Sequence, residues 1–308
     1  MRAVITGATG SVGREAADAL LARGVELIPI VRSLDALEIA REHAFEADLA
    51  SGEPPSIRES FDCVVHAAGD VRFKAEEGAN EKMMRSVLTL AKERGVPVYY
   101  VSTAYLHRPE GVAFVPVNAY EKDKKRAEEL LASSGVPHGI LRPAIVTGRR
   151  SDGRLMRFTG FYQAAALFVA AARRAKSEGR LFRFPRIKGK TALVPVDDVA
   201  QALAAMAEEG ARGTRYAALR EPPELPWLIE AVLRTYRLED AFAFEGRSFA
   251  DFRPESDEER ALAALERHFG PYWARADGFP AGGEGKPLDG SYIERILRYY
   301  DAHAADKL

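Results

Sequence analysis

The stretch "TGATGSVG", residues 6–13, follows the short apolar run "AVI" and leads into the helix-like sequence "SVGREAADALLARG". Its glycines fall at Gly7, Gly10 and Gly13. Glycine tolerates a positive φ and lets the backbone approach a phosphate, and a helix that begins here presents N–H groups and the positive end of its dipole. A strand, a glycine loop and a helix in this order predict a dinucleotide site, although the same glycines also suit a tight turn without a ligand.

The composition is that of a folded protein with little net charge. Of the 308 residues 47% are apolar and 29% charged, and the net charge of −1 argues against a nucleic-acid binder. The single cysteine, Cys63, excludes an internal disulfide and is expected in the core. The longest apolar stretch, residues 164–172, is too short to span a membrane, and no secretion signal is visible, so we expect a cytoplasmic protein.

Strand-like and helix-like segments alternate over the first two-thirds of the chain. The strand-like segments are 2–6, 26–31, 43–49, 63–68, 97–103 and 139–144, and the helix-like ones begin at residues 11, 33, 79 and 119. Continuously apolar strands that alternate with helices predict an α/β fold, a Rossmann-type doubly wound parallel sheet.

After residue 150 the alternation loosens. Helices are expected near 160–176, 197–209, 224–237, 255–269 and 291–304, among loops rich in glycine and proline. We therefore expect a cofactor-binding domain over 1–150, to which 191–210 returns, and a smaller, mainly helical substrate lobe over 151–308.

The end of the second predicted strand bears on which dinucleotide binds. An acidic residue there would bind the 2′-hydroxyl of NAD, but this chain has Arg32, whose guanidinium suits a 2′-phosphate. Arg14, in the first turn of the first helix, is placed to reach the same phosphate. NADP(H) is therefore preferred and NAD(H) is the alternative. Asp48 is interpreted either as an adenine contact or as the cap of a turn.

Residues suited to acid–base chemistry occur in "AYEKDKK". Tyr120 and Lys124 are four residues apart and share one face of a predicted helix. A nearby ammonium lowers the pKa of a phenol, so Tyr120 is expected to exchange a proton and Lys124 to assist it. Ser102 and Thr103 follow the fifth predicted strand, where a hydroxyl can bond a substrate oxygen, although both residues are also common in turns.

Together these motifs resemble those of the extended short-chain dehydrogenase/reductase family. The resemblance covers roughly residues 1–200 and includes "HAAG" (66–69), "VSTA" (101–104), "LRPAIVTG" (141–148) and "VPVDDVA" (194–200). It implies that Thr103, Tyr120 and Lys124 are catalytic and that His66 belongs to the cofactor loop, with no metal. Together the motifs and the resemblance give these expected cofactor-binding residues: Gly7, Thr9, Gly10, Ser11, Val12, Gly13, Arg14, Arg32, Asp48, Leu49, Ala67, Ala68, Gly69, Lys124, Pro143 and Ile145.

Within that family the chain is most similar to the thioester-reductase and fatty acyl-CoA-reductase branch. The similarity lies in "VSTAYL" and in "RPAIVTGRRSDGRLMRFTGFYQ", residues 142–163. The chain departs from the branch in "EKMMRSV" after Asn80, and it lacks the "SxYxxSK" helix of sugar-nucleotide epimerases because Asp123 precedes Lys124. The resemblance implies an NAD(P)H-dependent oxidoreductase that reduces a carbonyl or thioester carbon. The alternatives are a sugar-nucleotide epimerase or dehydratase with bound NAD, and a cofactor-binding regulator or scaffold without catalysis.

Residues 149–190 carry twelve Lys or Arg and two acidic residues, Asp152 and Glu178. Such asymmetry is typical of an anion-binding surface, but a solvated basic face explains it equally well. In the first interpretation the substrate is a small molecule such as an anionic acyl thioester, bound by Arg149, Arg150, Arg154 and Arg186. Neither nucleic acid nor a membrane span is expected, and a homodimer remains open.

Overall fold

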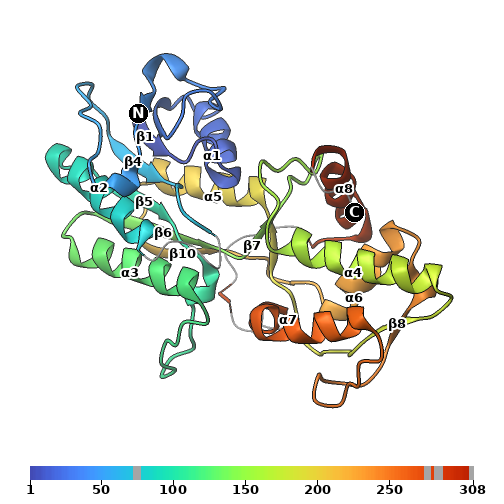
Figure 1. Ribbon diagram of the computed structural model, residues 1–308. Helices are drawn as coiled ribbons and strands as arrows, with labels where there is room; N and C mark the ends of the chain where they lie inside the picture. Colours follow the sequence, from blue (N-terminus) through green and yellow to red (C-terminus); the bar gives the residue numbers. More distant parts are fainter. Residues whose placement is uncertain (72–77, 274–278, 281–286, 305–308) are drawn as a thin grey trace. The chain divides into compact units, whose positions relative to one another are not determined.

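The computed structural model describes residues 1–71, 78–273, 279–280 and 287–304 (Figure 1). The chain forms two compact units. The first comprises Met1–Val146 and Val196–Ala217, and the second comprises Thr147–Pro195 and most of the chain after residue 217. The chain therefore leaves the first unit, returns to it once and leaves it again. The assignment of a cofactor domain and a substrate lobe, with boundaries near residues 150 and 191–210, stays a prediction.

The first unit is built on a seven-stranded sheet with the strand order β10-β6-β5-β4-β1-β2-β3, in which every pair of neighbours is parallel. The expected Rossmann-type α/β fold is thus confirmed. The edge strand β10 was not expected, because three of its five residues are exposed and it has no continuous apolar run. The strands are β1 (Arg2–Thr6), β2 (Glu26–Val31), β3 (Phe45–Glu46), β4 (Cys63–His66), β5 (Val98–Val101), β6 (His138–Pro143) and β10 (Gly213–Ala217).

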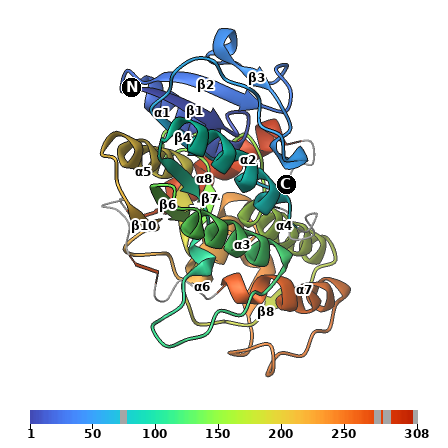
Figure 2. The ribbon, with the colours of Figure 1, turned by 90° about the vertical axis from the view of Figure 1, so that its left-hand side faces the viewer.

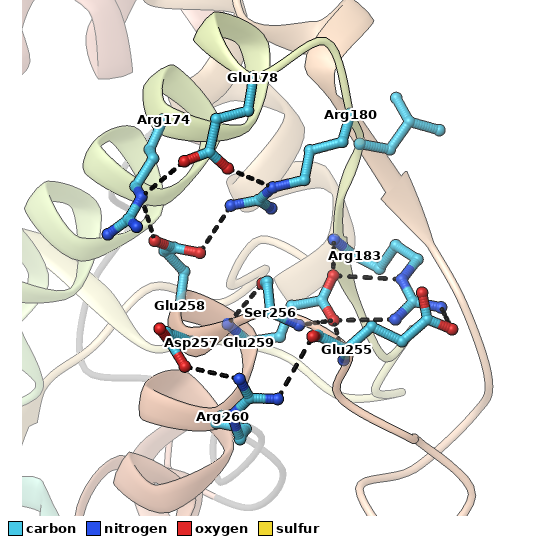
Figure 3. A pocket seen from close by; sticks show the side chains of 11 residues that line it. Arg174, Glu178, Arg180, Arg183, Glu255, Ser256, Asp257, Glu258, Glu259 and Arg260 are labelled. Atoms are coloured by element: carbon cyan, nitrogen blue, oxygen red, sulfur yellow. Dashed lines mark hydrogen bonds and ion pairs between the residues drawn. The ribbon is translucent and has the colours of Figure 1, made fainter.

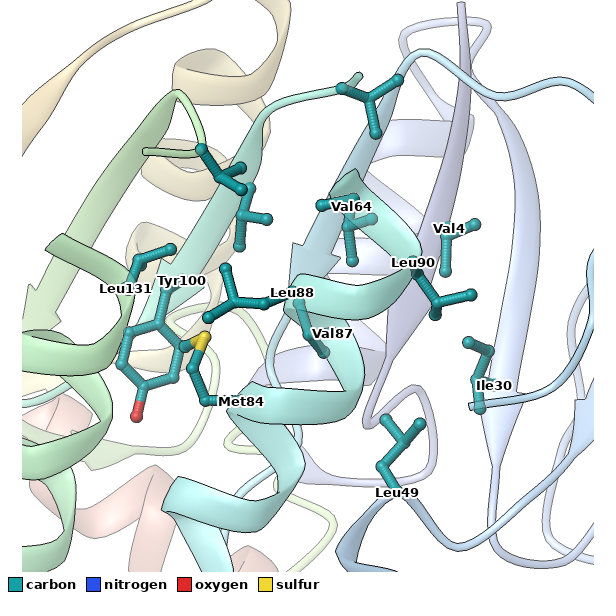
Figure 4. Packing of buried hydrophobic residues seen from close by; sticks show 14 of the residues in the cluster. Val4, Ile30, Leu49, Val64, Met84, Val87, Leu88, Leu90, Tyr100 and Leu131 are labelled. Carbon is teal, nitrogen blue, oxygen red and sulfur yellow. The ribbon is translucent and has the colours of Figure 1, made fainter. Parts of the chain in front are cut away.

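Helices cover both faces of this sheet. On one face α1 (Ser11–Leu21) packs against α5 (Val196–Glu208), and on the other α2 (Ala79–Arg94) packs against α3 (Ala119–Ser133), in front of the strands in Figure 2. Figure 4 shows the core beneath α2, where Met84 and Leu88 face Val64 and Tyr100 of the sheet. This core fixes α2 over β4 and β5 and α3 over β6. Helix α3 carries Tyr120 and Lys124.

The expected helix at residues 33–42 is wrong. This segment forms turns, followed by a single 3₁₀ turn, η1 (Arg41–His43). The carboxylate of Glu46 accepts the Leu34 N–H at 3.0 Å, and Ala40 has a φ of 43°, which ends any right-handed helix. Within the segment only Leu37 is fully buried, while Leu34 and Ile39 are partly exposed.

The second unit is mainly helical, with helices close to the expected ranges. Its small parallel sheet joins β8 to β11, and Phe182 and Phe184 of β8 pack on Phe168 of α4. None of the helices in the described part of the chain is long and apolar enough to cross a membrane. The elements are α4 (Phe161–Ser177), β8 (Phe182–Phe184), α6 (Leu225–Thr235), η4 (Glu239–Ala241), β11 (Phe242–Phe244), α7 (Asp257–Trp273) and α8 (Gly290–His303), and the chain passes between the units near β7 (Ile145–Thr147) and β9 (Leu193–Pro195).

Candidate active site

The strand order reverses between β1 and β4, and the loops that follow these two strands lie against each other. At the strand ends the Thr6 hydroxyl and His66 Nδ1 form a 2.7 Å hydrogen bond, and Ala68 N–H donates to the same hydroxyl at 3.2 Å. In parallel α/β sheets ligands bind outside the carboxyl ends of the strands at such a reversal. The glycine loop and the loop at 67–69 are therefore brought together where a dinucleotide is expected.

Packing explains why two of the three positions in the first loop are glycine. A Cβ on Gly7, which has a φ of 77°, would lie 2.6 Å from Ala68 N, and a Cβ on Gly13 would lie 2.1 Å from Gly7 O. Packing alone thus excludes side chains at Gly7 and Gly13. Gly10 is less crowded, with 3.3 Å to the nearest atom, and as the N-cap of α1 it offers no side-chain oxygen to the helix N-terminus. The arrangement fits a pyrophosphate at the start of α1.

The remaining residues expected around this loop lie at the same edge of the sheet. Thr9, Ser11 and Val12 are partly exposed, as are Ala67 and Ala68, while Gly69 is exposed. Leu49 is buried, and its carbonyl accepts the Ser86 hydroxyl at 2.8 Å. Asp48 caps the 3₁₀ turn η2 (Leu49–Ser51) by accepting the Ala50 N–H at 3.0 Å, as the turn-cap interpretation requires. Pro143 ends β6 and is buried, and Ile145 begins β7.

The two arginines expected to face a 2′-phosphate differ in their surroundings. Arg32 directly follows β2 and is exposed. Arg14 is mostly buried and is paired with Glu38, and more distantly with Asp18 at 3.4 Å. An anion at Arg14 would therefore have to compete with the Glu38 carboxylate, whereas Arg32 is open to solvent.

Thr103 and Tyr120 form the proton-exchanging part of the site. Thr103 is buried at the start of the 3₁₀ turn η3 (Ala104–Leu106), and its side chain is hydrogen-bonded to the Tyr120 phenol. Burial raises the pKa of Tyr120 to about 12, although the bond to Thr103 lowers it. The tyrosine therefore keeps its proton at neutral pH.

Lys124 lies one turn further along α3 and points into the protein. Its side chain is 3% exposed, its ammonium donates to the Val101 carbonyl at 3.0 Å, and it lies 4.8 Å from the centre of the Tyr100 ring. Burial lowers the pKa of Lys124 to about 8. The expected lowering of the Tyr120 pKa by Lys124 is not found, because burial of the phenol dominates and the ammonium is engaged by Val101 and Tyr100.

A buried polar cluster, which the sequence did not predict, surrounds Lys124. Asp123, 1% exposed, accepts hydrogen bonds from Asn80, the second residue of α2. His66 stacks on Tyr100 with ring centres 5.3 Å apart, and burial, with the nearby Lys124 charge, lowers the pKa of His66 to about 3. The signal for Asp123 was present: it shares a helix face with the apolar Ala127 and Leu131, and a carboxylate on such a face needs a partner.

A second buried pair flanks the site on α3 and β6. Arg142 of β6 forms a two-pronged ion pair with Glu128 of α3, with N–O distances of 2.9 and 2.5 Å. Its third nitrogen donates to the Tyr216 hydroxyl at 2.9 Å. This pair fixes α3 against the sheet and engages the charge of Glu128.

The basic residues of 149–190 lie in the second unit and many are paired. Arg149 pairs with Asp152 at 3.1 Å, and Arg186 pairs with Glu230 of α6 at 3.6 Å. Arg154 closes the same turn as Arg149, and the Arg150 carbonyl accepts from Arg295 of α8. Arg149, Arg150 and Arg154 therefore belong to one turn, and Arg186 lies after β8 beside α6; their role as substrate contacts stays a prediction.

A pocket of about 640 Å³ in the second unit also belongs to this basic segment (Figure 3). Its walls are ion pairs between α4–β8 and α7, with Arg180 on Glu258 at 2.7 Å and Arg183 on Glu259 at 2.9 Å. The cations that line the pocket have carboxylate partners on α7, so we interpret them as ion pairs that hold α4 and β8 against α7 and not as a candidate active site. In the part of the chain that the structure describes, no group of His, Cys, Asp and Glu could hold a metal ion.

Comparisons with known proteins agree with this architecture. The model of the NAD dependent epimerase/dehydratase family matches residues 3–218. A comparison with curated proteins finds none that matches the chain.

Solved structures of both reductases and epimerases have a similar fold. A thiolation-reductase di-domain of an archaeal non-ribosomal peptide synthetase is 17% identical with a TM-score of 0.73, covering 98% of this chain and 75% of that one. The terminal R domain of the myxalamid PKS-NRPS pathway is 18% identical with a TM-score of 0.68, covering 98% and 91%. UDP-glucose 4-epimerase of Thermus thermophilus, in complex with NAD, is 21% identical with a TM-score of 0.56, covering 88% and 99%. At these identities the likeness shows the fold alone.

Proposed function

The chain belongs to the NAD dependent epimerase/dehydratase family, and on that premise we propose that it is an NADP(H)-dependent oxidoreductase that reduces the carbon of a carbonyl or thioester group. The observation that carries the proposal is the hydrogen bond between Thr103 and Tyr120, one helical turn from the buried ammonium of Lys124. A bound nicotinamide cofactor supplies the hydride in such a reaction.

Tyr120 is the proposed proton donor. With a pKa of about 12 it is protonated at neutral pH, and a donor in this state suits reduction, in which the carbonyl oxygen takes up a proton. Thr103 orients the phenol and is placed to share its hydrogen bond with the substrate oxygen. Lys124 supplies a positive charge for the ribose and the negative charge of the cofactor.

The glycine loop and the start of α1 are proposed to hold the pyrophosphate. Gly10 leaves the helix N-terminus without a side chain, and the loop Ala67–Gly69 faces the same edge of the sheet. Arg32, exposed at the end of β2, supports the preference for NADP(H), since its guanidinium matches a phosphate. Arg14 supports it less, because Glu38 already binds it.

The direct test is a screen for NADPH oxidation with acyl thioesters, aldehydes and ketones, run beside NADH. The proposal expects turnover with one of these classes, and its loss in Tyr120→Phe with NADPH still bound. Turnover that is equal in the wild type and in Tyr120→Phe would refute the assignment of Tyr120.

The second candidate function is that of an epimerase or dehydratase acting on a nucleotide sugar. The family match and the epimerase-like folds favour it. Such an enzyme keeps its NAD bound and isomerises or dehydrates the substrate without net consumption of cofactor. NMR spectra of nucleotide sugars incubated with the protein, without added NADPH, distinguish it from a reductase.

A further inference from the structure

Asp123 lies directly before Lys124 on α3 but bonds to a different helix. Its carboxylate accepts the backbone N–H of Asn80 at 2.8 Å, the side-chain Nδ2 of Asn80 at 2.8 Å and the Glu81 N–H at 3.3 Å. The N-cap residue of α2, Gly78, provides no side-chain cap of its own. A buried carboxylate of α3 therefore caps the N-terminus of α2, where it also meets the positive end of the helix dipole.

Asn80 passes this constraint to the loop after β4. Its Oδ1 accepts the Asp70 N–H at 3.0 Å, and its Nδ2 donates to the Asp70 carbonyl at 3.1 Å. A Cβ on Gly69 would lie 2.9 Å from Asn80 Oδ1 and 3.0 Å from Lys124 Nζ. Asn80 and Lys124 thus both lie against Gly69. Asp123 accepts hydrogen bonds from Asn80 and directly precedes Lys124 on α3.

We propose that Asp123 is a positioning residue of the cofactor site, which locks Asn80 and the loop at 67–70 to α3 and supplies the negative charge beside Lys124. The inference rests on the proposed function in one respect, that Lys124 binds the cofactor. In the "SxYxxSK" helix of sugar-nucleotide epimerases a serine precedes the lysine. A serine in place of Asp123 would provide neither the negative charge nor the two carboxylate oxygens that accept from the three N–H donors.

The other groups that face Lys124 leave Asp123 as the main source of negative charge. From β4 His66 is neutral, and from β5 Tyr100 is protonated because burial raises its pKa. From α2 the neighbour is the uncharged Asn80, and on α3 itself Tyr120 is protonated.

On α3, Asp123 and Glu128 both raise the pKa of Lys124 against the larger effect of burial. Arg142 already engages Glu128 with two hydrogen bonds. Removal of the Asp123 charge should therefore lower the pKa of Lys124 further below about 8.

The experiment compares Asp123→Asn with the wild type and with a control, Glu129→Gln, which removes a carboxylate that pairs with Lys125 on the exposed side of the same helix. NADPH affinity is measured by nicotinamide fluorescence from about pH 6 to pH 10, and Lys124 is titrated by the NMR signals of the lysine ¹³Cε atoms in protein labelled with ¹³C-lysine, which leaves the buried amine unmodified. Its signal is assigned by its loss in Lys124→Arg.

In the wild type, affinity should fall as the pH rises through about 8, where Lys124 loses its charge. In Asp123→Asn the midpoint of both titrations should shift downward by about one pH unit or more, and affinity at pH 8 should fall roughly fivefold or more, because the charged fraction of Lys124 falls from about one half to about one tenth. In the control neither should move. An unchanged Lys124 midpoint in Asp123→Asn overturns the inference.

Two further measurements distinguish the charge of Asp123 from its capping hydrogen bonds, and a failure of this inference from a failure of the proposed function. Asp123→Glu keeps the charge, so its Lys124 midpoint should stay near that of the wild type even if the cap is strained, and a shift equal to that of Asp123→Asn refutes the electrostatic role. It also serves as the test if Asp123→Asn does not fold. If the wild type binds neither NADPH nor NADH, the proposed function fails and with it the link to a cofactor, while the Lys124 titration in the unliganded protein still decides whether Asp123 sets the charge of Lys124.

Discussion

Gly13→Ala should destabilise the first unit, although alanine is the better helix former. A Cβ at Gly13 would lie 2.1 Å from Gly7 O and 2.5 Å from Gly7 C, and both are backbone atoms. Ordinary contact begins near 3.4 Å, so α1 and the loop must separate by roughly 1.3 Å. Overpacking of this kind costs about 1–3 kcal/mol, more than the gain of up to about 1 kcal/mol in helix propensity.

The matched control is Gly290→Ala, because Gly290 also lies in a helix but has no atom within 4 Å of a Cβ. It should be neutral or stabilising by up to about 1 kcal/mol. Thermal unfolding followed by circular dichroism measures both variants, and Gly13→Ala should melt several degrees lower, at roughly 2–4 °C per kcal/mol. If the two variants are equally stable, the packing argument for Gly13 is refuted.

Gly10→Ala separates the role of a ligand from the role of packing. Its Cβ would lie 3.3 Å from Gly7 O, which small shifts relieve, so stability should change little. The methyl group would however lie at the uncapped start of α1, where we propose that the pyrophosphate binds. NADPH affinity should therefore fall in Gly10→Ala, and fluorescence titration that finds it unchanged would contradict this position for the phosphates.

The remaining predictions concern the chemistry and specificity of the site. Tyr120→Phe should retain NADPH affinity and lose about 10²- to 10⁴-fold in turnover, measured with the substrate found in the screen. Arg32→Asp should shift the ratio of NADPH to NADH dissociation constants toward NADH, and a wild type that binds both equally would show that Arg32 is not the determinant. Arg149→Ala combined with Arg150→Ala should raise the KM for a charged thioester but not for a short neutral aldehyde, and added salt should weaken the thioester more. Equal effects on both substrates would assign the two arginines to surface charge.

The features that the sequence predicted are those encoded locally. The glycines of the first loop, the helix that follows them and the shared face of Tyr120 and Lys124 all depend on residues within a few turns of one another. The parallel sheet follows from the alternation of apolar strands with helices.

What the sequence did not reveal depends on residues far apart in the chain. The hydrogen bond between Asn80 and Asp123 joins residues 43 positions apart. The basic residues of α4 and β8 have acidic partners on α7, such as Glu258 for Arg174. Charge counted along a segment cannot anticipate such pairing. Residues 33–42 show the converse, since their local helix propensity yields to a bond from Leu34 to Glu46 and to the conformation of Ala40.

The discontinuity of the first unit has a consequence for synthesis on the ribosome. On the ribosome α1 lacks its packing partner α5 until residue 208 has emerged, and the sheet lacks its edge strand β10 until residue 217 has emerged, by which time Thr147–Pro195 are already outside. The side of α1 that packs against α5 stays uncovered until α5 has emerged. A nascent chain stalled before residue 196 should therefore expose apolar surface on the incomplete first unit and bind a holdase chaperone. A chain in which α5 has been translated should bind that chaperone less.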